Sequence, residues 1–207
     1  MSALNSKHTW PLAPLDLPFL IPFRGLFTDE EIDKIVEIGS RLELELSTTT
    51  TVDASSGVAK PTNTTTSYRT SKSKLIPVSE ENSWLFIKIA EAVSRVNTEI
   101  FDFDISIIEC LQFSAYKTGE YYKSHIDIGT VAPYSTRKLS FAVQLTDETE
   151  YSGGDLNIFV SEVPYNFSRK KGDIIFFPSY ILHEVTPVTS GERKSLVGWV
   201  LGPSKFK

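Results

Sequence analysis

The sequence is poor in the residues that would build a disulfide framework or a thiolate metal site. Its 207 residues include a single cysteine, Cys110, so no internal disulfide can form. This cysteine lies in an apolar run, 107–111, where we expect a buried structural thiol. A structural zinc site normally uses four protein ligands, usually with several cysteines, and the sequence cannot supply that set.

The chain also lacks the features that a membrane or a nucleic acid would require. No apolar run approaches the ~18 residues needed to span a bilayer. The N-terminus has no secretory signal. The 21 basic side chains are outnumbered by 26 acidic ones, and the net charge of −5 gives no general attraction to phosphate backbones or anionic membranes. We therefore expect a soluble, cytoplasmic protein that binds neither membranes nor nucleic acids.

The first half of the sequence predicts an extended arm and two helices. Four prolines within residues 1–22 favour an arm that lies extended over the domain. A helix is predicted to begin after the N-cap Thr28, where acidic residues and an apolar stripe follow, and to end at Gly39. A second helix is predicted over about 80–99, with Ser79 preceding its first acidic residues.

Between the helices, residues 42–52 alternate leucine with polar residues and predict a half-buried strand. Residues 47–67 are rich in Thr, Ser, Gly, Ala and Pro. This composition favours a flexible hairpin or loop, and not an interdomain linker, because no independent core precedes it.

The second half is rich in short β segments separated by Gly, Pro, Asn and Asp turns. Strands are predicted over 105–116, 120–128, 138–146, 155–160, 173–177, 181–186 and 193–201. Two helices followed by such strands predict a mainly β fold with flanking helices (α+β), in which a sandwich carries the helices on one outer face. We treat 1–207 as one domain, with the arm, helices and 47–67 segment in 1–103 and the β core in 104–203.

Only three histidines are present, and two of them fall in the β-rich half. His125 and Asp127 are two residues apart, which places an imidazole and a carboxylate on the same face of a strand. His183, on a later strand, could complete a set of two nitrogens and one oxygen. This set leaves coordination positions open and is typical of non-haem Fe(II) oxygenases. The alternative is that these are ordinary hydrogen-bonding histidines.

Arg193 strengthens the metal hypothesis. It lies ten residues after His183, past a predicted turn at 187–191, and so on the adjoining strand. A guanidinium that points into a β-sandwich is costly without an anionic partner. A ligand carboxylate would satisfy it through bidentate hydrogen bonds, to which the hydroxyl of Ser195 could add. The alternative is a structural Arg–Glu pair at the rim of the sandwich.

These residues belong to five blocks: Gln112–Asp127, Arg137–Phe141, Gly153–Leu156, Lys171–Pro178 and His183–Arg193. In this order the blocks resemble the Fe(II)/2-oxoglutarate dioxygenases of the prolyl 4-hydroxylase type, in particular the bacterial PKHD-type hydroxylases. The resemblance covers about residues 69–201. It implies a double-stranded β-helix (jelly-roll) core, with the N-terminal helices supporting the larger sheet.

The resemblance assigns three ligands to the iron: His125, Asp127 and His183. It assigns Arg193 to the distal carboxylate of 2-oxoglutarate. Tyr116 stands where the family often has a hydroxyl directed at the cosubstrate, and a core aromatic residue is the alternative. Gln144 stands where some prolyl hydroxylases carry an aromatic residue, so it could contact cosubstrate or substrate differently.

The activity implied is hydroxylation of an unactivated C–H bond with Fe(II), O2 and 2-oxoglutarate, releasing succinate and CO2; ascorbate is compatible as a further reductant. The expected substrate is a prolyl residue in a peptide or protein, over which the 47–67 segment could close as a lid. A free amino acid or small metabolite is the alternative substrate, and a non-catalytic cupin-like metal-binding jelly roll the alternative function. Nucleic-acid repair is disfavoured, because Trp199 stands where that branch usually carries a second arginine.

Overall fold

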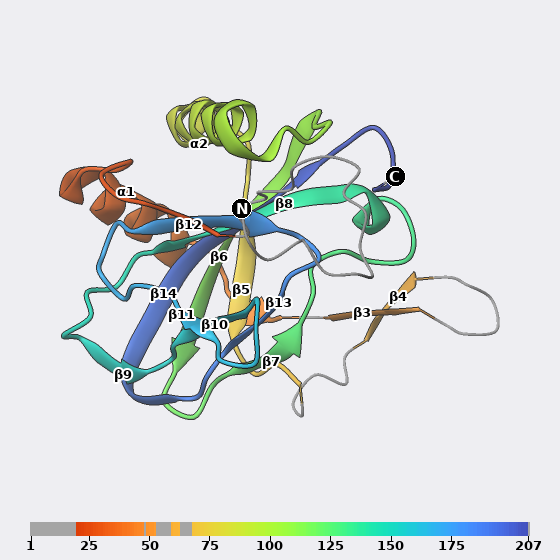
Figure 1. The fold of residues 1–207 in the computed structure, drawn as a ribbon. Coiled ribbons are helices and arrows are strands. Elements are labelled where there is room, and N and C mark those ends of the chain that lie inside the picture. Colours follow the sequence, from red (N-terminus) through yellow and green to blue (C-terminus); the bar gives the residue numbers. More distant parts are fainter. Residues whose placement is uncertain (1–19, 48, 53–58, 63–67, 207) are drawn as a thin grey trace, which may run out of the picture.

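Two antiparallel sheets face each other in the computed structural model, which describes residues 20–47, 49–52, 59–62 and 68–206 (Figure 1). The larger sheet has the strand order β1–β12–β8–β14–β6–β5–β2, and β9 also pairs with β14. Its strands are β1 (Ile21–Phe23), β2 (Glu45–Leu46), β5 (Lys72–Ile76), β6 (Ile107–Lys117), β8 (Arg137–Gln144), β9 (Tyr151–Gly153), β12 (Ile174–Pro178) and β14 (Val188–Leu201). The N-terminal half thus supplies strands to both edges of this sheet.

The smaller sheet has the order β11–β10–β13–β7. Its strands are β7 (Tyr122–His125), β10 (Leu156–Phe159), β11 (Tyr165–Asn166) and β13 (Leu182–Val185). An apolar layer joins the two sheets, with Ala142, Ile175 and Phe177 of the larger sheet packing in one cluster with Leu156 and Ile158 of the smaller. Burying both inner faces in this way holds β7 and β13 against β14 and β6.

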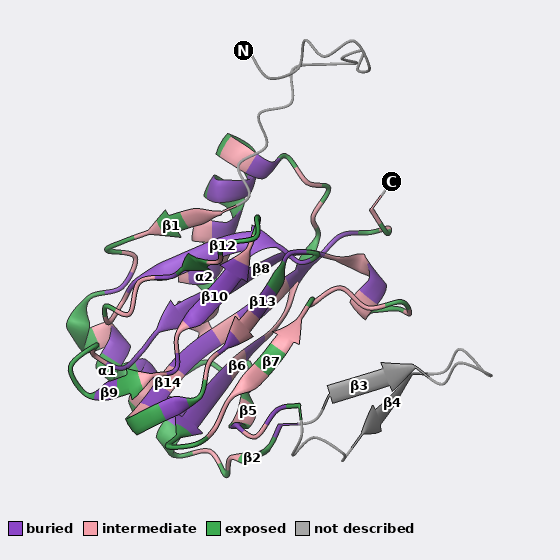
Figure 2. Ribbon diagram, turned by 60° about the horizontal axis from the view of Figure 1, so that its bottom comes forward, coloured by how far each residue is buried: buried purple, intermediate pink, exposed green. Residues whose placement is uncertain are grey.

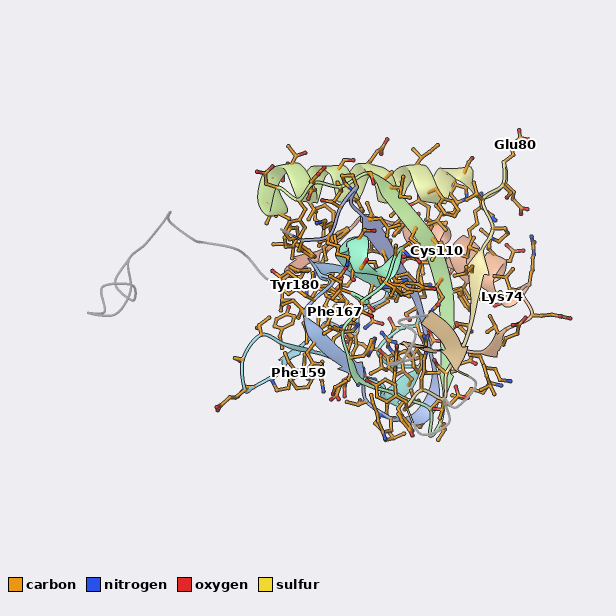
Figure 3. All side chains as sticks on the ribbon, turned by 90° about the vertical axis from the view of Figure 1, so that its right-hand side faces the viewer. Lys74, Glu80, Cys110, Phe159, Phe167 and Tyr180 are labelled. Atoms are coloured by element: carbon orange, nitrogen blue, oxygen red, sulfur yellow. The ribbon has the colours of Figure 1, made fainter. Side chains whose placement is uncertain are left out.

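Two helices cover the outer face of the larger sheet, α1 (Asp29–Ser40) and α2 (Ser83–Val96), and a π-helical turn (Asn97–Phe101) follows α2. Figure 3 views the layers edge-on, with α2 along the top and Phe159 of the smaller sheet in the lower half. The helices contribute Ile32, Ile35, Leu85, Ile89 and Val93 to the main core, which they share with the sheet. The mainly β fold with helices on one outer face is therefore confirmed.

Helix α1 agrees with its sequence prediction at both ends. The hydroxyl of Thr28 accepts a hydrogen bond from the backbone N–H of Glu31, and the Glu31 carboxylate accepts one from the backbone of Thr28. This reciprocal capping box satisfies two of the free N–H groups at the helix start. Figure 2 shows where the buried residues concentrate, notably on β8 and β12, whose inner and outer faces are both covered.

Three predicted boundaries are wrong. The second helix begins at Ser83, because Ser79 accepts a hydrogen bond from the N–H of Asn82 and closes a turn before the helix. The range 42–52 is not one strand: it contains β2 and, separately, β3 (Thr49–Val52). The turn predicted at 187–191 is absent from the described chain, because pairing with β9 keeps those residues extended as the start of β14.

Part of the 47–67 segment forms a hairpin, in which β3 pairs antiparallel with β4 (Ala59–Thr62). The rest of the segment (48, 53–58 and 63–67) lies outside the described residues, as do residues 1–19 of the predicted arm. At the end of the arm, β1 is extended and pairs with β12. No helix among the described residues has the length and apolar character required to cross a membrane.

We predict that Gly39→Ala destabilises the protein by about 1–3 kcal/mol, the usual cost of overpacking a core. A methyl group at Gly39 would lie 2.2–2.4 Å from three ring carbons of Phe113, a buried residue of β6, so α1 would have to lift from the sheet. Chemical unfolding measures the change. The neighbouring exposed Ser40→Ala is the control, and equal stability of the two variants would contradict this packing.

Candidate metal centre and cosubstrate pocket

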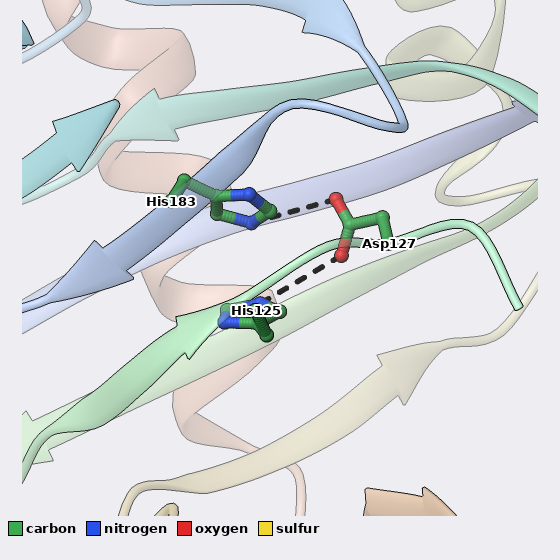
Figure 4. A group of neighbouring side chains, drawn as sticks. All are labelled: His125, Asp127 and His183. Carbon is green, nitrogen blue, oxygen red and sulfur yellow. Dashed lines mark ion pairs between the residues drawn. The ribbon is translucent and has the colours of Figure 1, made fainter. Parts of the chain in front are cut away.

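Three predicted ligands converge between the sheets. His183 on β13 lies directly opposite His125 on β7 in the antiparallel register. The Nε2 atoms of His125 and His183 lie 3.8 Å and 3.5 Å from the two carboxylate oxygens of Asp127 (Figure 4). One ligand atom from each of the three residues lies within 4.8 Å of the others. This spacing allows all three to reach a single ion.

Each imidazole is oriented by its own strand. The Nδ1 atom of His125 lies 2.8 Å from the carbonyl oxygen of Lys123, and that of His183 lies 2.9 Å from the carbonyl oxygen of Ile181. A carbonyl accepts only, so each Nδ1 carries the proton and each Nε2 keeps its lone pair. A hydrogen bond from the ring nitrogen that does not face the metal is typical of histidines that bind metals.

Asp127 reaches the cluster from a bend, and not from the strand on which we predicted it. Strand β7 ends at His125, and the N–H groups of Asp127 and Ile128 both donate to the carbonyl oxygen of Ser179, at 2.9 Å and 3.0 Å. These bonds replace the continuing ladder and turn the carboxylate toward the imidazoles. The imidazole of His125 and the carboxylate of Asp127 nevertheless lie on the same side of the chain, as the sequence predicted.

The electrostatics keep the ligands in their metal-binding forms. Burial, with the neighbouring His183, lowers the pKa of His125 to about 3, so this imidazole is neutral at physiological pH. Burial by itself would raise the pKa of Asp127, but the two imidazoles, Arg137 and Ser140 together lower it below its usual value. At physiological pH the cluster therefore offers a neutral imidazole at His125 and an ionised carboxylate at Asp127 beside the imidazole of His183.

Arg193 is an almost fully buried charged residue that lines this pocket. It is 2% exposed and lies opposite Tyr116 in the pairing of β14 with β6, its guanidinium 5.4 Å from the Tyr116 ring. Its Nη1 lies 3.4 Å from the hydroxyl of Ser195, and its Nε has no hydrogen-bond partner. No carboxylate of the described residues forms an ion pair with it, which argues against a structural Arg–Glu pair.

The other predicted site residues lie around Arg193. Ser195 and Tyr116 are buried and line the same pocket as the metal ligands. Tyr116 also packs in the apolar layer between the sheets, so its ring serves the core as well. Gln144 lies opposite Ser195 in the pairing of β8 with β14, where its amide nitrogen donates to the carbonyl oxygen of Ser168 at 3.0 Å. It does not line the pocket.

The pocket has a volume of about 980 Å³ and extends well beyond the ligands and Arg193. Its outer wall includes residues that the sequence did not single out. The ring of Tyr122 stacks on His125 with 3.6 Å between centroids, and the guanidinium of Arg69 lies 4.5 Å from the Tyr122 ring. Arg137 forms a bidentate ion pair with Glu109, at 2.7 and 2.9 Å. Arg69 is distant from His125 in sequence. Tyr122 lies three residues before His125, and in a regular strand its side chain would point to the opposite face.

Cys110 also lines this wall and is only partly buried, not fully buried as predicted. Burial raises the pKa of its thiol to about 12, so the prediction that it is not a nucleophile agrees with its surroundings.

The residues fit the cofactors that the sequence suggested. Two imidazole nitrogens and a carboxylate oxygen on one side of a pocket form the donor set that non-haem Fe(II) sites use, with positions left for other ligands. The unpaired Nε of Arg193 and the adjacent hydroxyl of Ser195 can both donate to a carboxylate. The pocket can therefore hold a metal ion and a dicarboxylate together.

Comparison with known proteins agrees with this geometry. Residues 111–201 match the family model of the 2OG-Fe(II) oxygenase superfamily. The matched range includes every residue of the predicted site. A PKHD-type hydroxylase of Idiomarina loihiensis is 36% identical over 85 residues, which are 41% of this chain and 38% of that protein. The matches to curated relatives span between 36% and 56% of the length of those proteins.

Two solved structures have a fold similar to that of this chain. A crystal structure of a Pseudomonas putida prolyl-4-hydroxylase has a TM-score of 0.70 at 18% identity, covering 89% of this chain and 93% of that one. A prolyl hydroxylase from Trichoplax adhaerens, in complex with a hypoxia inducible factor peptide fragment, also has a TM-score of 0.70, at 16% identity, covering 88% and 83%. The double-stranded β-helix and the resemblance stated from the sequence are confirmed.

We predict that His183→Ala lowers the affinity for Mn(II), a redox-stable probe for this centre, by more than about 100-fold. Loss of a residue that only hydrogen-bonds to a metal ligand lowers metal affinity by about 10–100-fold, and loss of the ligand itself should lower it further. Calorimetric titration measures the affinity. Glu184→Gln is the matched control, since its side chain bonds Ser124 and Asn157 on the other face of the strand. Equal binding by both variants would exclude His183 as a ligand.

Proposed function

We propose that this protein is an Fe(II)- and 2-oxoglutarate-dependent dioxygenase that hydroxylates an unactivated C–H bond, with release of succinate and CO2. The observation that carries the proposal is Arg193, buried beside the ligand cluster with an unpaired Nε and no carboxylate partner among the described residues. A buried, uncompensated cation is costly, and a dicarboxylate cosubstrate offsets that cost. A purely metal-binding cupin-like protein has no need of it.

In this proposal the metal is held by His125, Asp127 and His183, and it supplies the oxidation when loaded with O2 and 2-oxoglutarate. Arg193 binds the far carboxylate of the cosubstrate and Ser195 adds a hydroxyl donor. The remaining wall residues have a protective role. Tyr122 stacks on one imidazole, and Phe177 meets the other with its ring edge-on, 4.9 Å between centroids, so both histidines are shielded from water.

The substrate that the pocket favours is a prolyl residue within a peptide or protein. In this proposal metal and cosubstrate lie near Arg193, and the same cavity is also lined by Lys74 of β5 and by Glu45 of the edge strand β2. A cavity of about 980 Å³ has room for a segment of peptide, whereas a single amino acid would leave most of it empty. The curated relative is named a PKHD-type hydroxylase, and both solved structures are prolyl hydroxylases.

We predict that Arg193→Leu weakens 2-oxoglutarate binding by about 10- to 100-fold, because hydrogen bonds to charged groups contribute about 1.5–3 kcal/mol. Calorimetry with Mn(II)-loaded protein measures this affinity, and the affinity for Mn(II) itself should change little. Arg95→Leu is the control, since Arg95 is an exposed residue of α2 paired with Glu99. An unaltered affinity for 2-oxoglutarate in Arg193→Leu would remove Arg193 from this role.

Substrate class can be tested by measuring succinate formation with proline-containing peptides, free amino acids and other small metabolites in parallel. We expect peptides to stimulate turnover and to gain about 16 Da, the mass of the inserted oxygen atom. His183→Ala should abolish both signals. Stimulation by free amino acids alone would replace the peptide substrate with a small one while leaving the chemistry intact.

A further inference from the structure

A second arginine, besides Arg193, is buried in the cavity. Arg69 is 7% exposed and lines the same cavity as the metal ligands. Its Nε donates to the hydroxyl of Ser71 at 2.7 Å, and its Nη2 donates to that of Ser114 at 3.4 Å. Within the part of the chain that the structure describes, its Nη1 has no hydrogen-bond partner and its charge has no carboxylate partner. Neutral hydroxyls satisfy hydrogen bonds but leave a buried charge uncompensated.

Arg69 is held close to the metal ligands by Tyr122. The two residues form an antiparallel bridge, and the guanidinium lies 4.5 Å from the centre of the Tyr122 ring. That ring stacks in turn on the imidazole of His125, with 3.6 Å between centroids. A single aromatic ring thus separates the guanidinium from a metal ligand. Two or three residues of an extended peptide, at about 3.3–3.6 Å each, span this separation.

Two further cationic side chains line the cavity, and both are already paired. Arg137 forms the bidentate ion pair with Glu109, and Lys74 forms an ion pair with Glu45. All four of these residues line the cavity, so their charges cancel within it. Arg69 differs from both cations, because it lines the cavity without an acidic partner among the described residues.

The charges of the remaining groups balance once the proposed centre is loaded. An imidazole that binds a metal is neutral, so the metal ligands contribute one negative charge, from Asp127. A dicarboxylate cosubstrate contributes two more. The divalent metal and the guanidinium of Arg193 together supply three positive charges, which cancel them. The positive charge of Arg69 is therefore left over, and the substrate is the one component still to be bound.

We propose that Arg69 binds a carboxylate of the substrate. The inference rests on the proposed function and narrows its substrate class to a prolyl peptide with an acidic group within about three residues of the hydroxylated position. A peptide carbonyl would accept hydrogen bonds from the guanidinium but would leave its charge uncompensated. A carboxylate does both, through charge-assisted hydrogen bonds. It belongs to an Asp or Glu side chain or to the end of a peptide chain, since the same two oxygens would meet Arg69.

Calorimetry tests the proposal on protein loaded with Mn(II) and 2-oxoglutarate. Two peptides with both ends blocked differ only in an Asp or an Asn next to a single proline, and a second such pair places this residue on the other side of the proline. We expect an Asp peptide to bind about 10- to 100-fold more tightly than its Asn partner, because hydrogen bonds to charged groups are the stronger ones. A further Asn peptide ends in a free carboxylate, and tight binding of this peptide alone identifies a terminal carboxylate as the group bound. Equal binding of all the peptides would overturn the proposal.

Arg69→Gln should remove the preference for the carboxylate, since an amide carries no charge. The matched control is the double variant Lys74→Gln, Glu45→Gln, which removes another cation of the same cavity together with its acidic partner and should keep the preference. A preference that survives Arg69→Gln, or that is lost equally in the control, contradicts the role of Arg69. If Arg69→Gln fails to fold, Arg69→Lys replaces it: a lysine lacks the planar fork of donors, so the preference should fall, and an unchanged preference overturns the proposal.

The same titrations keep two failures distinct. If 2-oxoglutarate does not bind to the Mn(II)-loaded protein, the proposed function is wrong and this inference falls with it. If 2-oxoglutarate binds but the peptides do not differ, only the assignment of Arg69 is wrong. Succinate formation by the Fe(II)-loaded protein should rank the peptides in the same order when compared as kcat/KM, and the opposite order would contradict carboxylate binding.

Discussion

The burial of one positive charge constrains the rest of the pocket. Arg193 lies in β14, where it pairs with Tyr116 of β6, and β8 pairs with β14 from Ser195 onward, so the backbone that carries the guanidinium is fixed within the larger sheet. Among the described residues nothing anionic neutralises it. The guanidinium of Arg193 therefore remains a charged donor whose Nε has no hydrogen-bond partner. The larger sheet supplies the rigidity that keeps it in place.

The two halves of the proposed site come from different sheets. The metal ligands belong to β7, β13 and the bend after β7, whereas the carboxylate-binding residues belong to β14. Neither sheet holds a complete site, and the distance between the halves is set by the apolar layer that includes Ile158, Ile175 and Phe177. Core packing between the sheets is thus a geometric requirement of the function, because a small shift would separate metal from anchor.

Local spacing predicted much of this site. The alternation of strand side chains was enough to place His125 and Asp127 together, and the cost of a buried guanidinium was enough to single out Arg193. The contact of Tyr122 with His125 was not predictable in this way, because residues three apart point to opposite faces of a regular strand. The register of β7 against β13 shifts by one residue between them, and this irregularity brings both rings to the same face.

Pairing between segments that are far apart in the sequence explains the error at the predicted 187–191 turn. Pro187 and Gly191 have the composition of a turn, yet the residues after Pro187 remain extended because β9, far along the sequence, pairs with them. Likewise Arg69 enters the pocket only through a bridge to Tyr122 across more than fifty residues. Local propensity contains no information on such pairings, which tertiary structure decides.

The hydrogen bonds from both Nδ1 atoms to the carbonyls of Lys123 and Ile181 have a consequence for metal identity. They orient both imidazoles through the backbone itself, and two imidazoles with one carboxylate form a donor set that several divalent metals accept. Divalent metals then follow their intrinsic order of affinity for nitrogen ligands, in which Fe(II) ranks below Co(II), Ni(II) and Cu(II). The metal that is bound at the proposed centre in a cell is then determined by which metal ions are available there, since the ligands themselves do not favour Fe(II).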